Sequence, residues 1–147
     1  MENKTHTHDD LTLSSVLDDL RKSHLRITEP RKAILLALLE HHGPFTAEEL
    51  HKRFTKKICD LATIYRCVSS LVEAGIIKRC EFGDRSARYE LSERNRHHHH
   101  HVICTECKKI EVLDDCELDE IDRFARKRGF SGVSHSLEFF GVCPACK

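Results

Sequence analysis

The chain has no long apolar run, no leader-like segment and no excess of charge of either sign. No stretch approaches the roughly 18 apolar residues that a membrane span requires, and residues 1–10 are too polar for the core of a signal peptide. We therefore expect a globular cytoplasmic protein that does not contact a membrane. Because 24 basic residues balance 24 acidic residues, binding to nucleic acid would have to depend on a local patch and a motif.

Cysteine, in contrast, is plentiful. The chain has eight cysteines, and in a protein without a leader this favours metal binding and free thiols over disulfides. Four of them form two Cys-x-x-Cys pairs, Cys104 with Cys107 and Cys143 with Cys146. Two intervening residues let one turn present both sulfurs to a tetrahedral Zn²⁺ ion. A disulfide pair and a redox motif are alternatives, but the doubled motif favours structural zinc.

Five consecutive histidines, residues 97–101, run directly into the first cysteine pair. In an extended segment, side chains alternate between two faces, so the odd-numbered histidines would share one face and His98 and His100 the other. One strand could then supply two metal sites. A purification tag or a loosely binding low-complexity tract would have a similar composition. The continuity with the apolar strand pattern at residues 102–104 favours specific ligands.

The first half of the chain carries four helical patterns. The spacing of apolar residues predicts helices over residues 11–24, 28–41, 46–54 and 60–75. Thr46 and Glu49 have the spacing of a capping box. In the fourth helix, Tyr65 and Arg66 fall near the N-terminal end and off the apolar face, which is typical of a helix-turn-helix reader of DNA. A plain helical hairpin is the alternative.

A β-hairpin is predicted directly after the fourth helix. Strand patterns at residues 76–79 and 87–91 flank the turn at residues 82–85. A hairpin in this position makes a winged helix and strengthens the DNA-binding interpretation. We expect four basic side chains to decorate the wing and to meet phosphates: Lys78, Arg79, Arg85 and Arg88.

The remainder of the chain predicts a second, smaller domain of mixed helix and sheet. We interpret residues 93–96 as a hinge between a winged-helix domain, residues 1–92, and an αβ domain, residues 97–147. A domain of roughly 50 residues builds little core, so zinc would contribute part of its folding energy. Its sheet also has an open edge, which favours pairing with a second copy. The predicted fold class is α+β.

Three motifs in order now resemble a known family. They are Leu61-Ala62-Thr63-Ile64-Tyr65-Arg66, the histidine tract with its Cys-x-x-Cys pair, and His135-Ser136-Leu137-Glu138 with Gly141-Val142-Cys143. Together they resemble the ferric uptake regulator (Fur) family, from about Leu13 to Cys146. The resemblance implies a dimeric, metal-sensing transcription repressor with an N-terminal winged-helix domain, a hinge and a C-terminal dimerisation domain.

The resemblance also implies four sets of site residues. Structural zinc would be held by Cys104, Cys107, Cys143 and Cys146. The regulatory metal would use Glu90, His99 and His101, with His42 or His41 nearest to the position where the family often adds a histidine and this chain has Pro44. An additional site would use His98, His100, Asp119 and His135. DNA would be contacted by Arg31, Thr63, Tyr65 and Arg66.

The identity of the regulatory metal follows less directly. One glutamate with imidazoles suits Fe²⁺, Mn²⁺ or Zn²⁺. Zinc sensors that resemble this chain often add a cysteine, and Cys80 does not match that position well. Peroxide sensors of the family use aspartate where this chain has Glu90. We therefore expect an iron-responsive repressor of metal uptake genes, with a zinc uptake regulator second and a peroxide-responsive regulator third.

The expected partners of the protein are a second copy of the chain and double-stranded DNA. A two-fold symmetric homodimer predicts a palindromic operator in double-stranded DNA, and assembly could extend to tetramers. A metalloenzyme would need an open coordination position and a positioned base, so we expect no enzyme. A metal buffer would have no use for Tyr65 or Arg66. The remaining cysteines are expected to be buried free thiols: Cys59, Cys67, Cys80 and Cys116.

Overall fold

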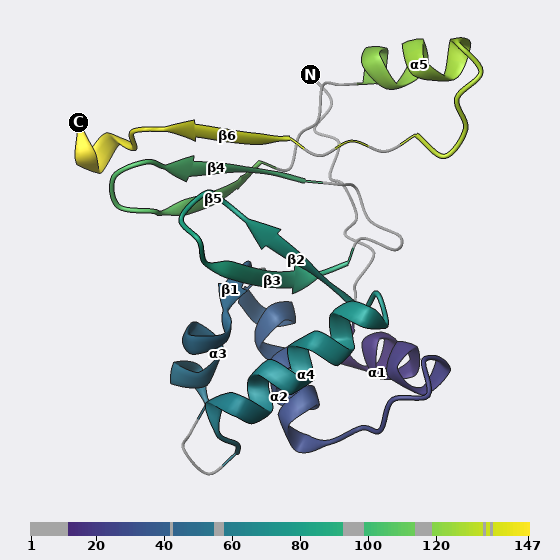
Figure 1. Ribbon diagram of the computed structural model, residues 1–147, viewed down its shortest axis with the longest axis vertical. Coiled ribbons are helices and arrows are strands. Elements are labelled where there is room, and N and C mark those ends of the chain that lie inside the picture. Colours follow the sequence, from purple (N-terminus) through teal and green to yellow (C-terminus); the bar gives the residue numbers. More distant parts are fainter. Residues whose placement is uncertain are drawn as a thin grey trace, which may run out of the picture. The chain divides into compact units, whose positions relative to one another are not determined.

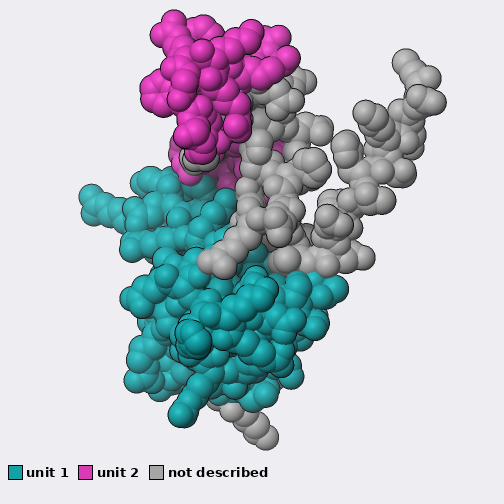
Figure 2. Space-filling model, turned by 90° about the vertical axis from the view of Figure 1, so that its right-hand side faces the viewer, with its two compact units in different colours: residues 1–94 teal, residues 95–147 magenta. Residues whose placement is uncertain are grey.

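The protein contains helices and two small sheets, as the α+β prediction requires (Figure 1). The computed structural model describes residues 12–41, 43–54, 58–92, 99–113, 119–133, 135 and 137–147. The chain divides into two compact units, residues 1–94 and residues 95–147, which Figure 2 shows in different colours. The predicted hinge, residues 93–96, lies outside the described residues. Within the described part of the chain, no helix is long and apolar enough to span a membrane.

Four helices build most of the first unit. They are α1 (Leu13–Lys22), α2 (Glu29–His41), α3 (Ala47–Arg53) and α4 (Leu61–Glu73). The predicted capping box is confirmed, because Glu49 N–H donates to Thr46 Oγ1 at 3.1 Å and Thr46 N–H donates to Glu49 Oε2 at 2.8 Å. Asp60 caps α4 by accepting the N–H of Thr63 at 2.7 Å. Local sequence therefore defines where α3 and α4 begin.

The apolar faces of these helices meet in one core. Leu20 of α1, Leu35 of α2, Leu50 of α3 and Ile64 of α4 are all fully buried. Since side chains on one face of each helix are removed from water together, this packing supplies the main stabilisation of the first unit. It also leaves the opposite face of α4 in solvent.

The helices pack with a three-stranded antiparallel sheet. Its strands are β1 (Phe45–Thr46), β2 (Ile77–Glu81) and β3 (Ala87–Leu91), in the order β1-β3-β2. The β2–β3 hairpin follows α4 directly, so the predicted winged helix is present. The two-residue strand β1 was not predicted, because it is too short to show alternation.

One feature of the predicted wing is wrong. Arg88 does not face outward: it is 8% exposed, and its two terminal nitrogens donate to the two carboxylate oxygens of Asp84 at 3.0 and 2.7 Å. The reason is the pairing of β1 with β3, which places Thr46 opposite Arg88 and makes β3 the central strand. On β2, Lys78 and Arg79 also form ion pairs, with Glu90 at 2.8 Å and with Glu81 at 2.5 Å. Carboxylates on the wing itself therefore balance much of its positive charge.

The second unit contains another three-stranded sheet, with strand order β5-β4-β6. Its elements are β4 (His100–Cys104), β5 (Ile110–Leu113), α5 (Asp119–Lys127), β6 (Glu138–Gly141) and a short 3₁₀ turn at Pro144–Cys146. β4 pairs antiparallel with β5, with Ile103 opposite Ile110. β6 runs parallel to β4, so both strands lead to the same end of the sheet. This is where the four cysteines of the two pairs meet.

The described part of the second unit buries little apolar surface. Ile103 and Cys104 are its buried apolar residues, whereas several large apolar side chains are exposed: Leu113, Ile121, Phe124, Phe130, Phe139, Phe140 and Val142. A single chain therefore leaves this unit with a small core and a large apolar surface in water. Both features match the expectation that the unit depends on metal and on a second copy.

Candidate metal centres and nucleic-acid interface

The four cysteines of the two Cys-x-x-Cys pairs lie together at the ends of β4 and β6. Their sulfur atoms, from Cys104, Cys107, Cys143 and Cys146, all lie within 4.8 Å of one another. A tetrahedral zinc ion with Zn–S bonds of about 2.3 Å requires sulfurs separated by roughly 3.8 Å. Cys107 Sγ and Cys143 Sγ are 3.7 Å apart, which fits that edge and is far longer than a disulfide bond of about 2 Å. The donor set therefore fits a closed tetrahedral zinc site.

The electrostatics of this cluster favour a bound cation. The N–H of Cys143 donates to Cys104 Sγ at 3.3 Å, and this bond, with other backbone N–H groups, lowers the pKa of the Cys104 thiol to about 6. In contrast, hydrogen bonds with the neighbouring cysteines, Cys143 first, raise the pKa of Cys146 to about 12. The first thiolate forms easily, and the last forms against the negative charge already present. A divalent cation removes that opposition.

The described histidines of the tract contact two different sets of side chains. His100 and His101 belong to β4 and are buried. The rings of His99 and His101 are 5.0 Å apart, nearly perpendicular at 87°, whereas the ring of His100 stacks on His135 at 5.2 Å. This is the alternation expected of an extended segment. His97 and His98 lie outside the described residues.

His100 and His135 have the geometry of a ligand pair. Their Nε2 atoms are 3.4 Å apart. Two imidazoles bound to a tetrahedral metal at about 2.1 Å would have nitrogens separated by roughly the same distance. The structure thus brings together two of the four residues predicted for the additional site. His98 and the side chain of Asp119 lie outside the part that is described.

The predicted ligands of the regulatory site come from both units. Glu90 lies on β3 of the first unit and is 3% exposed. Its Oε1 accepts from Lys78 Nζ at 2.8 Å and from the thiol of Cys80 at 3.5 Å. His99 and His101 lie in the second unit. His42 is outside the described residues, and His41 ends α2 with Nε2 3.9 Å from a carboxylate oxygen of Glu40.

The N-terminal half of α4 presents the predicted DNA-contacting side chains to solvent. Tyr65 is 44% exposed, and its hydroxyl donates to a carboxylate oxygen of Glu48 on α3. Arg66 is also exposed, and its Nη2 donates to Thr63 Oγ1 at 2.9 Å. Thr63 therefore helps to orient Arg66. Both outward-facing side chains are held by a neighbour.

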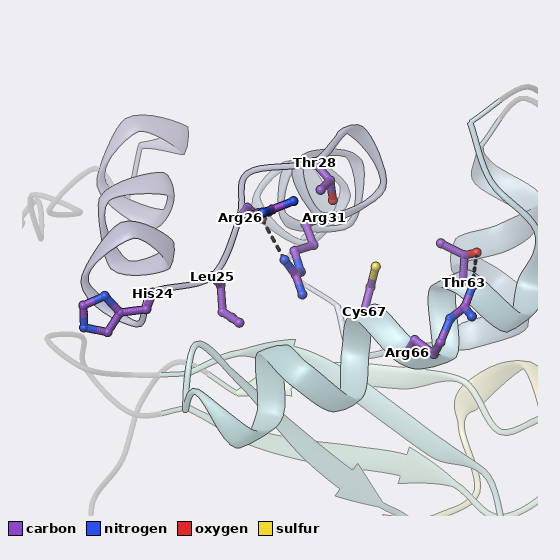
Figure 3. A pocket seen from close by; sticks show the side chains of 8 residues that line it. All are labelled: His24, Leu25, Arg26, Thr28, Arg31, Thr63, Arg66 and Cys67. Atoms are coloured by element: carbon purple, nitrogen blue, oxygen red, sulfur yellow. Dashed lines mark hydrogen bonds between the residues drawn. The ribbon is translucent and has the colours of Figure 1, made fainter.

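A cavity of about 440 Å³ lies beside these residues, between α4 and the connection from α1 to α2 (Figure 3). Among the described residues, its lining includes three arginines, one histidine and no carboxylate: His24, Leu25, Arg26, Thr28, Arg31, Thr63, Arg66 and Cys67. A concavity with cationic donors and no acidic group attracts anions. Its chemistry suits a phosphate group.

Arg31 links two of the segments that line this cavity. Its Nη1 donates to the carbonyl of Arg26 at 2.8 Å, and its Nη2 donates to Ser70 Oγ at 3.2 Å. The side chain thus ties the connection before α2 to α4. Its Nε is buried and has no hydrogen-bond partner among the described residues. This N–H is a donor for which an oxygen of a bound anion would be a suitable acceptor.

Comparison with known proteins identifies the fold. Residues 22–140 match the Ferric uptake regulator family. The chain belongs to this family. Because the match spans residues 22–140, the resemblance found in the sequence motifs is confirmed over most of the chain.

Individual relatives span almost the whole length. The peroxide-responsive repressor PerR of Staphylococcus epidermidis is 35% identical over 141 residues, which cover 94% of this chain and 92% of that protein. The crystal structure of Fur from Vibrio cholerae is 31% identical, with a TM-score of 0.72, and covers 86% of this chain and 98% of that one. Fur from Pseudomonas aeruginosa with manganese is 27% identical, with a TM-score of 0.72, and covers 87% of this chain and 97% of that one.

The sequence did not reveal two polar partners of the predicted DNA-contacting residues in this Fur-family chain. Glu48, the acceptor for Tyr65, is 17 residues away in the chain, and Ser70, which binds Arg31, is 39 residues away. No periodicity or short motif links residues at such separations. Lys78 was predicted to meet phosphates from the wing. The register of β2 and β3 instead places it directly across the hairpin from Glu90.

Proposed function

We propose that this Fur-family regulator is a dimeric repressor whose DNA binding depends on a regulatory metal, with Fe²⁺ the favoured ion. The main support for DNA binding is the exposed pair Tyr65 and Arg66 on α4, next to a cavity whose described lining has three arginines and no carboxylate. Side chains on α4 would enter the major groove, and the cavity would receive a backbone phosphate. A metal buffer would need neither feature.

The regulatory site would join the two units. Glu90 comes from the first unit and His99 and His101 from the second, so a complete ligand set would require one particular arrangement of the units. A cation bound by all three would supply the energy that favours this arrangement. Binding biases an equilibrium only through a difference in affinity between its states, and an incomplete ligand set provides that difference.

The dimer interface would form from the second unit. Its exposed apolar side chains include Phe124, Phe139 and Phe140. Removing such surface from water stabilises association. The outer edges of β5 and β6 pair with no further strand in the described part of the chain, which leaves room for contact with a second copy. A dimer with two-fold symmetry would present two α4 helices and would favour a palindromic operator.

The donors suit iron without distinguishing it from manganese or zinc, and a peroxide response is the second candidate. Glu90 with two imidazoles suits Fe²⁺ or Mn²⁺, although Zn²⁺ competes for any such site. The relative from Staphylococcus epidermidis that is 35% identical is a peroxide-responsive repressor. The resemblance implies aspartate at this position in peroxide sensors of the family, whereas this chain has Glu90, and this difference keeps iron-responsive control of metal uptake as the first proposal.

The test is DNA binding by the purified full-length protein to the promoter of its own gene. Fe²⁺ (under anaerobic conditions), Mn²⁺ and Zn²⁺ would be buffered separately at fixed salt, with metal content measured alongside. We expect Fe²⁺ or Mn²⁺ to induce tight binding in a protein that already holds one structural zinc per chain. A response only to a second zinc would identify a zinc uptake regulator. No binding with any metal would contradict the proposal.

A second arm separates the iron and peroxide candidates. The Fe²⁺-loaded and Mn²⁺-loaded proteins would be exposed to dilute hydrogen peroxide before DNA is added. Rapid loss of DNA binding by the Fe²⁺ form alone would favour the peroxide-responsive candidate, since Fe²⁺ reacts readily with peroxide and Mn²⁺ does not. His99→Ala should abolish metal-dependent DNA binding and leave the dimer intact. Loss of the dimer instead would assign His99 a structural role.

A further inference from the structure

The exposed phenol of Tyr65 is in contact with a carboxylate. Tyr65 lies on α4, Glu48 lies in the first turn of α3, and the Tyr65 hydroxyl is hydrogen-bonded to Glu48 Oε1. Both side chains are exposed, so neither is needed to fill the core. The contact therefore does not serve core packing, and its role lies at the exposed surface of α4.

The chemistry of the two groups fixes the direction of this hydrogen bond. An ionised carboxylate can only accept, so the phenol O–H must donate. The bond lowers the pKa of Glu48 and raises the pKa of Tyr65, which keeps the carboxylate charged and the phenol protonated near neutral pH. With its hydrogen committed to Glu48, the Tyr65 oxygen has only lone pairs to offer another molecule.

A carboxylate at this position also opposes DNA binding in general. It repels phosphates and therefore lowers affinity for every DNA sequence. Besides accepting directly from cytosine N4, a carboxylate can increase specificity by changing what a neighbouring side chain is able to read. Tyr65 is the neighbour that Glu48 changes.

We propose that Glu48 makes Tyr65 an acceptor-only reader of the major groove, which selects a base with an exocyclic amino group, adenine or cytosine. Adenine N6 and cytosine N4 donate in that groove, whereas thymine O4 and guanine O6 only accept. Arg66, held by Thr63, supplies donors and suits guanine. The two adjacent side chains on α4 thus read opposite hydrogen-bonding patterns. This inference rests on the DNA-binding function proposed above.

The test measures base preference rather than affinity alone. The metal-loaded full-length protein would be titrated, at one fixed salt concentration, with its operator and with every single-base substitution of one half-site. We expect one adenine or cytosine position at which Glu48→Ala reduces the wild-type discrimination by roughly threefold to tenfold. The same variant frees the phenol to donate, so binding to thymine or guanine at that position should improve. Tyr65→Phe should remove the preference at the same position.

Three further variants make the result specific. In Glu48→Gln the amide oxygen can still accept from the phenol, so this variant should retain part of the discrimination. In the Tyr65→Phe background, Glu48→Ala should have no further effect on base preference. Glu73→Gln removes an exposed carboxylate from the other end of α4 and should leave the preference unchanged.

The outcomes separate this inference from the proposed function. If Glu48→Ala strengthens binding to all sequences equally, Glu48 is only a repelling surface charge and the inference is wrong. If Tyr65→Phe keeps the wild-type preference, the phenol does not read a base. In both cases an intact operator complex that is lost in Arg66→Ala would still support the proposed function. A wild-type protein without operator binding would overturn both proposals.

Discussion

At the scale of single residues, the ion pair between Asp84 and Arg88 fixes the turn of the wing. Both side chains are largely buried, and the two hydrogen bonds from the Arg88 guanidinium lower the pKa of Asp84 from 3.8 to about 2. A carboxyl whose pKa is depressed in the folded protein stabilises the fold at any pH above its unfolded pKa. That stabilisation is lost as the pH falls from about 4 through about 2.

Asp84→Asn should therefore lower the free energy of unfolding by about 2 kcal/mol at neutral pH. The difference from the wild type should shrink progressively between about pH 4 and pH 2, where the wild-type carboxyl itself becomes protonated. Urea unfolding followed by circular dichroism at a series of pH values measures this. Glu81→Gln is the control, because its partner Arg79 and Glu81 itself are both more than half exposed. A difference that does not vary with pH would contradict the assignment to this ion pair.

At the scale of secondary-structure elements, the β2–β3 hairpin holds a proposed metal ligand in place. The register puts Lys78 directly opposite Glu90, and the ammonium lies 2.8 Å from the carboxylate. A cation that binds Glu90 shares this carboxylate with the Lys78 ammonium, and the two positive charges repel each other. Lys78 would therefore raise the metal concentration that is needed to fill the regulatory site. Its ammonium would become available to DNA phosphates once it is displaced from Glu90.

Lys78→Gln should raise the affinity of the regulatory site for Mn²⁺ by roughly threefold to tenfold, the size expected for a partly exposed ion pair. Competition with a chelator measures the affinity without DNA, so that a lost phosphate contact does not obscure the result. Arg79→Gln removes the neighbouring charge, whose partner is Glu81 and not Glu90. Equal shifts in the two variants would show that general electrostatics, rather than the Lys78–Glu90 pair, sets the metal affinity.

At the scale of the whole molecule, the two units differ in how they are stabilised. The first unit has a continuous apolar core built from four helices and a sheet. The described part of the second unit buries few apolar residues and holds β4 and β6 together at the end where the four thiols meet. We therefore expect the second unit, and the dimer it would form, to depend on zinc.

Cys104→Ser should reduce the zinc content from one ion per chain to near zero and should convert the dimer to monomer or unfold the second unit. Elemental analysis and analytical ultracentrifugation give the two quantities. Cys59→Ser is the matched control, because Cys59 lies in the first unit and outside the thiol cluster. A stable Cys104→Ser dimer with unchanged zinc content would contradict the structural role.

Much of the local structure could be predicted because it depends on neighbours in the chain. Helices α1 to α4, the capping box at Thr46 and the cap at Asp60 follow from apolar spacing and from side chains three residues apart. The wing hairpin follows from alternation. The prediction that Arg88 faces outward on the wing was wrong for a physical reason. The burial of Arg88 depends on β1, which is distant in sequence and too short to leave a pattern.

Residue types and their spacing account for the chemical groups of this protein: two thiol pairs, an alternating histidine tract and a helix with outward-facing Tyr65 and Arg66. These depend on residue type and spacing, which are local. Which of these groups meet depends on tertiary packing. The parallel pairing of β4 with β6 gathers the four thiols, the pairing of β2 with β3 places Lys78 on Glu90, and the packing of α3 with α4 gives Tyr65 its carboxylate. Such contacts join residues far apart in the chain, and their positions are set by the burial of apolar surface on other faces of the same elements.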